Sequence, residues 1–272
     1  MLAKRTLVVV ILLPIGILAI YAGGWIFTCV VAVFLVGAAW EYQTMFRARG
    51  LKPATVILLA GVMGILADRY VNGFANAAGL ISLLVLISMT YHLWDYERGS
   101  DQAATEFSLT LAGILYIGWI GAYLVSLRNL PGGYWWIFLV LPSVWLADAA
   151  AYFIGKSFGK HKLAPRLSPK KTWEGYIGGI LAGTLLTAGL AALLQQLAGA
   201  EAAITPMRGV WVGLAMSIFP TLGDLGESMF KRQLGFKDSS NLLPGHGGFF
   251  DRIDSWLWAA VLGYYLVVWL FT

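Results

Sequence analysis

The sequence contains few charged residues and only one cysteine. Charged side chains make up 12% of the 272 residues, about half the usual share of a soluble domain. Because Cys29 stands alone, no intrachain disulfide can form, and its place in an apolar run indicates a packed thiol rather than a reactive one. Neither a GxGxxG pattern nor a Walker A loop is found, so no dinucleotide-binding or P-loop fold is indicated.

Long apolar stretches fill most of the chain, since 59% of the residues are hydrophobic. Runs of about 20 apolar residues are typical of transmembrane helices. The first run follows Lys4 and Arg5 but lacks a good cleavage site, so we interpret it as a retained span rather than a signal peptide. We predict an all-α, polytopic membrane bundle with nine spans, at 6–22, 25–40, 54–68, 74–94, 107–127, 134–154, 175–198, 209–223 and 255–271.

The distribution of basic residues predicts the orientation of these spans. With the N-terminus in the cytoplasm, alternating connections place all of the 19 lysines and arginines on the cytoplasmic side except Arg69, Arg128 and Arg208. This asymmetry explains the net charge of +5 and the pI near 9.3 without a nucleic-acid partner. We therefore expect a protein of the bacterial inner-membrane type, with both charge-rich connections facing the cytoplasm.

The two halves of the chain differ in their chemistry. Residues 1–130 carry few candidate groups and are predicted to form a transmembrane scaffold, whereas residues 131–272 are predicted to form the catalytic region. Asp148 stands among small residues inside an apolar segment. An ionisable group at such a position indicates a ligand or metal contact, but a hydrogen bond to a neighbouring helix is the alternative.

A basic connection precedes the span that begins near residue 175. Thr172 is predicted to cap that helix, and a helix N-terminus beside Lys170 and Lys171 is a suitable site for phosphate. Anchoring to lipid headgroups is the alternative, although it leaves the Ser168-Pro-Lys-Lys-Thr172 arrangement unexplained. The glycines at 175, 179 and 183 predict a stripe for close helix packing.

Acidic pairs flank the second basic connection. Asp224 and Glu227 are three residues apart, as are Asp251 and Asp254, so each pair would share a helix face. Carboxylates that meet in this way are typical of a divalent-metal site, although a helix N-cap is the alternative for Asp251. His246 suits either a phosphate contact or a turn. Between and around the acids lie basic or polar candidates for phosphate binding, namely Ser228, Lys231, Arg232, Lys237 and Arg252.

These motifs resemble the phosphatidate cytidylyltransferase (CDP-diacylglycerol synthase) family. The likeness covers about residues 145–255 and rests on Asp148-Ala-Ala-Ala-Tyr152, Ser168-Pro-Lys-Lys-Thr172, Gly223-Asp224-Leu-Gly-Glu227-Ser228, and the run from Lys231-Arg232 through Lys237-Asp238 to His246-Gly-Gly-Phe-Phe-Asp251-Arg252-Ile-Asp254. The resemblance implies a membrane enzyme that converts CTP and phosphatidate to CDP-diacylglycerol and pyrophosphate. It also implies a homodimer and a requirement for Mg²⁺.

Under this hypothesis the candidate residues take three roles. Asp224, Asp251, Asp254 and Glu227 are the expected Mg²⁺ ligands, and they leave room for a second cation. Catalytic roles fall to Asp224, Asp251, Lys231 and Arg232. The expected substrate contacts are Ser168, Lys170, Lys171, Thr172, Ser228, Lys237, His246, Arg252 and Asp148. Two other functions remain open, a CTP-dependent polyprenol kinase and an ion-coupled transporter.

Overall fold

The structure is a computed structural model that describes residues 2–199, 203–240, 242 and 247–271. Its helices confirm the predicted all-α membrane bundle, because each predicted apolar segment corresponds to one helical stretch. The elements are α1 (Leu2–Ala22), α2 (Gly24–Arg47), α3 (Thr55–Asn72), α4 (Ala77–Glu97), α5 (Ala103–Gly113), the π-helical η1 (Ile114–Trp119), α6 (Tyr123–Arg128), α7 (Gly133–Phe158), β1 (Lys162–Ala164), β2 (Ser168–Thr172), α8 (Trp173–Ala198), α9 (Pro206–Ile218), α10 (Pro220–Gln233), α11 (Phe250–Leu266) and the π-helical η3 (Val267–Phe271).

Several of these helices, alone or joined to the next element, are long enough to cross a bilayer. Eight stretches of the described chain meet the length and hydropathy of a membrane span, and Leu12–Ala22 is a shorter apolar helix before them. Three of the stretches, Ala103–Arg128, Pro206–Gln233 and Phe250–Phe271, each join consecutive elements into one span. The protein is therefore an integral membrane protein.

The chain divides into two compact units. Unit 1 contains residues 1–126 and 233–253, and unit 2 contains residues 127–232 and 254–272. The connection after α10 thus belongs with the N-terminal helices. The assignment of scaffold and catalytic roles to residues 1–130 and 131–272 stays a prediction, because a compact unit is not in itself a functional domain.

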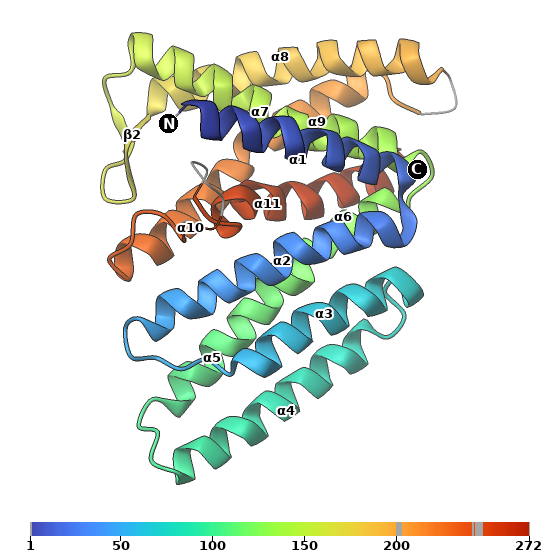
Figure 1. The fold of residues 1–272 in the computed structure, drawn as a ribbon. Coiled ribbons are helices and arrows are strands. Elements are labelled where there is room, and N and C mark those ends of the chain that lie inside the picture. Colours follow the sequence, from blue (N-terminus) through green and yellow to red (C-terminus); the bar gives the residue numbers. More distant parts are fainter. Residues whose placement is uncertain (1, 200–202, 241, 243–246, 272) are drawn as a thin grey trace. The chain divides into compact units, whose positions relative to one another are not determined.

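In unit 1, α2, α3 and α4 lie side by side, and α5 and η1 pack against them (Figure 1). Apolar side chains of α3 and η1 fill the core, with Leu58, Val62 and Ile117 fully buried. Gly113 brings α5 close to this core, since a Cβ atom there would lie 2.7 Å from Leu58 Cδ1 and 3.0 Å from Tyr42 Cε1.

In unit 2, α7, α8 and α9 pack against one another (Figure 1). The predicted glycine stripe forms the contact with α7: a Cβ on Gly179 would lie 2.7 Å from Ala151 Cβ. Thr172 caps α8 as predicted, because its hydroxyl accepts a hydrogen bond from Gly175 N at 3.2 Å. The connection before α8 forms an antiparallel hairpin, in which Lys162 pairs with Thr172 and Ala164 with Ser168.

Candidate metal and phosphate site

Three carboxylates meet where α10 and α11 pack together. Asp224 and Glu227 on α10 and Asp254 on α11 each offer an oxygen atom, and these atoms all lie within 4.8 Å of one another. The structure thereby confirms that acids from the eighth and ninth predicted spans converge. Oxygen atoms at this spacing form a ligand set suited to a hard divalent cation.

Two lysines neutralise part of this acidic cluster. Lys171 Nζ, at the end of β2, lies 2.6 Å from Asp224 Oδ2. Lys231 Nζ lies 2.5 Å from Glu227 Oε2, one turn along α10, and both side chains are buried. Lys171 of the hairpin and three of the predicted metal ligands, Asp224, Glu227 and Asp254, are therefore parts of one cluster in unit 2.

Asp148 on α7 belongs to the same neighbourhood. Its carboxylate interacts electrostatically with Lys171 and Asp224, and Asp254 in turn interacts with Asp224, Lys231 and Asp148. This placement favours the ligand or metal reading of Asp148 over an isolated hydrogen bond between helices. Charges gathered in a membrane protein usually mark a functional site.

Asp251 makes a different set of contacts, within unit 1. Its Oδ2 atom accepts hydrogen bonds from Ser239 N at 2.9 Å and Gly248 N at 2.8 Å, and it lies 2.7 Å from Ser239 Oγ. The carboxylate thus orders the segment that leads into α11, which is close to the capping role held open from the sequence. Its role as a metal ligand stays a prediction.

The remaining predicted residues differ in exposure. Ser228 is buried beside Asp224, with 3.4 Å between Ser228 Oγ and Asp224 Oδ1. Ser168 opens β2 and is half-buried, and the hydroxyl of Thr172 is occupied by its helix cap. His246 lies outside the described residues. The basic side chains that face solvent are Lys170, Arg232, Lys237 and Arg252.

A buried carboxylate that sequence reasoning missed is Glu41 on α2. It is 1% exposed and accepts hydrogen bonds from the segment that precedes α11. The sequence gives one weak signal, a lone acid that follows the apolar run of α2.

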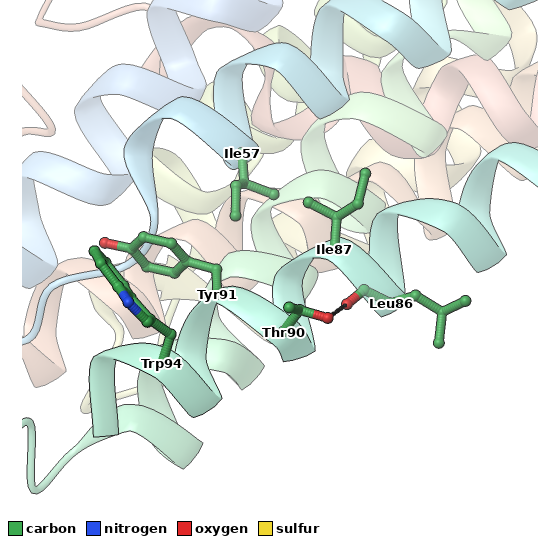
Figure 2. A pocket seen from close by; sticks show the side chains of 6 residues that line it. All are labelled: Ile57, Leu86, Ile87, Thr90, Tyr91 and Trp94. Carbon is green, nitrogen blue, oxygen red and sulfur yellow. Dashed lines mark hydrogen bonds between the residues drawn. The ribbon is translucent and has the colours of Figure 1, made fainter. Parts of the chain in front are cut away.

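A groove of about 510 Å³ lies between α3 and α4, and none of the charged residues described above belongs to its lining. Figure 2 shows its apolar and aromatic lining, with Ile57 from α3 facing Ile87, Tyr91 and Trp94 of α4. The hydroxyl of Thr90 is used within the helix, since it donates to Leu86 O at 2.8 Å. With no charged side chain in its lining, this groove offers nothing that would hold a phosphate.

Comparison with known proteins agrees with the chemistry of the cluster. The model of the cytidylyltransferase family matches residues 3–270, almost the whole chain. The chain belongs to the cytidylyltransferase family. The family and the class of enzyme predicted from the motifs, a nucleotidyltransferase, are thus confirmed.

Curated relatives of this cytidylyltransferase share its full length. A protein of Synechocystis named phosphatidate cytidylyltransferase is 32% identical over 97% of this chain and 96% of its own. Proteins of the same name from Bacillus subtilis and Pseudomonas aeruginosa are 34% and 36% identical, over 87% and 99% of this chain and 87% and 97% of theirs. The likeness therefore includes the N-terminal spans, which the motifs alone do not cover.

Proposed function

We propose that this cytidylyltransferase acts on phosphatidate, so that CTP and phosphatidate give CDP-diacylglycerol and pyrophosphate. The observation that carries the proposal is the cluster of Asp224, Glu227 and Asp254 with Lys171 and Lys231 beside it. Family membership and the names of the relatives support cytidylyl transfer as the reaction, and we assign this cluster to it.

The reaction requires that two anions approach each other. An oxygen of the phosphatidate phosphate attacks the α-phosphorus of CTP, and the bond to the pyrophosphate leaving group breaks. A phosphate monoester already carries about −1.5 to −2 charge near neutral pH, so no general base is needed to activate it. Catalysis then depends on cancelling charge and on holding the two phosphates in line.

The acidic cluster fits the Mg²⁺ that the resemblance implies. Its donor atoms are all carboxylate oxygens, which Mg²⁺ prefers, and they come from two packed helices. Asp224, Glu227 and Asp254 would hold the ion, with Asp251 three residues before Asp254 as a further proposed ligand. Such an ion supplies positive charge to phosphate oxygens in the transition state. The acids also leave room for a second cation.

Lysines bring the remaining positive charge. Lys171 and Lys231 are held by Asp224 and Glu227, so their ammonium groups are fixed next to the place where the phosphates would bind. Lys170, Arg232, Lys237 and Arg252 face solvent and are proposed to attract the triphosphate. Ser168, Thr172, Ser228, His246 and Asp148 are proposed as further substrate contacts.

A labelling experiment tests the reaction itself. Purified protein is given phosphatidate, a polyprenol and CTP labelled at the α- or the γ-phosphate. Cytidylyl transfer puts the α-label into lipid and the γ-label into pyrophosphate. A polyprenol kinase would instead transfer the γ-label to a polyprenol and release CDP, and a transporter would consume no CTP.

Removal of the Lys171 charge is expected to weaken CTP binding. A hydrogen bond to a charged group contributes about 1.5–3 kcal/mol, so Lys171→Met should raise KM for CTP about 10- to 100-fold. Lys162→Met is the matched control, because Lys162 lies in the same hairpin and is exposed. Steady-state kinetics at saturating phosphatidate measure both variants; equal KM values in the two would contradict the role of Lys171.

We also propose that the site faces the cytoplasm and that the protein is a homodimer. The orientation is supported by the excess of basic residues in alternate connections. In a Cys29→Ser background, Lys160→Cys in intact cells should resist a membrane-impermeant maleimide, whereas Asn129→Cys should react. The reverse pattern would overturn the orientation, and the mass of the detergent-solubilised protein tests the dimer.

A further inference from the structure

Glu41 is a buried acceptor for four hydrogen bonds. Its Oε1 accepts from Ser240 Oγ at 2.6 Å and Phe249 N at 2.9 Å. Its Oε2 accepts from Ser239 Oγ at 2.8 Å and Phe250 N at 2.9 Å. The side chain is 1% exposed, and a buried carboxylate is stable only when it is bonded in this way.

The two oxygen atoms of Glu41 bind both ends of one segment. Ser239 and Ser240 stand about 200 residues after Glu41, and Phe249 and Phe250 follow at the start of α11. Each oxygen accepts from one serine hydroxyl and one backbone N–H. The carboxylate therefore fixes the distance between the two ends, and it also lies at a helix N-terminus, where negative charge is favourable.

Apolar contacts seat the same segment on α2. The ring of Phe249 fills the space beside Gly37, where a Cβ atom would lie only 2.6 Å away, and packs edge-on against Phe34 at 5.5 Å between centroids. Phe250 is fully buried and meets the ring of Tyr42 at 6.3 Å. The C-terminal end of the segment is thus held on α2 by contacts with Phe34, Gly37, Glu41 and Tyr42.

Ser239 links Glu41 to Asp251. Its hydroxyl oxygen lies 2.8 Å from Glu41 Oε2 and 2.7 Å from Asp251 Oδ2, and its N–H donates to Asp251 Oδ2 at 2.9 Å. Gly248 completes the arrangement, because a Cβ atom there would collide with Ser239 Oγ and Glu41 Oε2. Movement of Glu41 would therefore free the Ser239 hydroxyl and loosen one of the residues that hold the Asp251 carboxylate.

We propose that Glu41 is a positioning residue for cytidylyl transfer: from α2 it holds both ends of the 239–250 segment and so sets the direction of the Asp251 carboxylate. The proposal rests on the proposed role of Asp251 as a metal ligand. It gives the N-terminal spans a part in the reaction, through a carboxylate whose oxygens are bonded to residues 239, 240, 249 and 250.

The test compares Glu41→Gln with Glu106→Gln. Glutamine at position 41 replaces one acceptor oxygen by an N–H donor, which would face a serine hydroxyl and a backbone N–H. Glu106 is a matched control, since it is also buried in unit 1 and its carboxylate accepts from Lys52 N at 2.7 Å and Ser100 Oγ at 3.1 Å, two donors that lie outside the 239–250 segment.

We expect kcat to fall about 10- to 100-fold in Glu41→Gln and the Mg²⁺ concentration for half-maximal rate to rise about tenfold, as loss of a well-placed ligand would cause. Amide exchange at Phe249 and Phe250, measured without Mg²⁺, should accelerate in the same variant. Glu106→Gln should lower the thermal midpoint while kcat and the Mg²⁺ requirement stay within about twofold of the original.

The proposal would be overturned if Glu41→Gln kept the kcat and the Mg²⁺ requirement of the original protein. It would also be overturned if Glu106→Gln changed both quantities as much as Glu41→Gln does. If Glu41→Gln does not fold, Ser240→Ala removes a single donor to Oε1 and should raise the Mg²⁺ requirement about two- to fivefold; an unchanged requirement would be contrary to the proposal. If the proposed function is wrong, the unaltered protein will make no CDP-diacylglycerol. Hydrogen exchange at the amides of Phe249 and Phe250 still tests the role of Glu41 in that case.

Discussion

Asp224→Asn is expected to lower the turnover of cytidylyl transfer by about 10³-fold or more, because loss of a metal-ligand charge removes several kcal/mol of transition-state stabilisation. Asp224 is central to the cluster: it lies within 4.8 Å of the Glu227 and Asp254 oxygens and pairs with Lys171 at 2.6 Å. Asparagine keeps the size of the side chain and removes its charge. The measurement is CTP-dependent formation of CDP-diacylglycerol at limiting and at saturating Mg²⁺.

Asp68→Asn is a suitable control for this variant. Asp68 lies on α3 of unit 1 and accepts a hydrogen bond from Asn72 Nδ2 at 2.7 Å, within its own helix. Turnover of Asp68→Asn should stay within about twofold of the original, as is usual for substitutions away from a site. Binding of Mn²⁺, followed by its paramagnetic signal, should be lost in Asp224→Asn alone. Near wild-type turnover of Asp224→Asn at limiting Mg²⁺ would remove Asp224 from the ligand set.

Local spacing was sufficient to predict part of the site. Asp224 and Glu227 are one helical turn apart, so a helix through them brings both acids to one face whatever the rest of the fold. The cap at Thr172 is also a local feature, since its hydroxyl reaches an amide three residues later. For the same reason, the apolar runs predicted the helices and their order.

Contacts between distant segments could not be predicted in this way. Glu41 accepts from residues about 200 positions later, and neither periodicity nor composition connects such positions. The hydrogen bonds that Asp251 accepts from Ser239 N and Gly248 N depend on how these residues return to it. The hairpin of β1 and β2 escaped prediction for another reason: it is local, but Pro169 and two lysines are poor strand formers.

The close approach of α10 and α11 leads to the second large effect, which is expected for Gly223→Ala. A Cβ atom at position 223 would collide with the backbone oxygen of Asp254 and lie 2.7 Å from Trp258 Cδ1. Since helix backbone cannot yield as a flexible side chain does, α10 and α11 would separate beside the point where Asp224 meets Asp254. Turnover should fall about 100-fold or more, although every carboxylate and lysine of the cluster is retained.

Gly189→Ala is the matched control for this substitution. Gly189 lies inside α8, and a Cβ atom added there would have no neighbour within 4 Å, so alanine fits and favours the helix by about 0.5–1 kcal/mol. Its turnover and Mg²⁺ requirement should match those of the original protein, whereas Gly223→Ala should also need more Mg²⁺ for half-maximal rate. If Gly223→Ala kept both values, the spacing between the two helices would not matter for catalysis. The cluster would then be an ion-pair network that stabilises unit 2, and the metal would have to be held elsewhere.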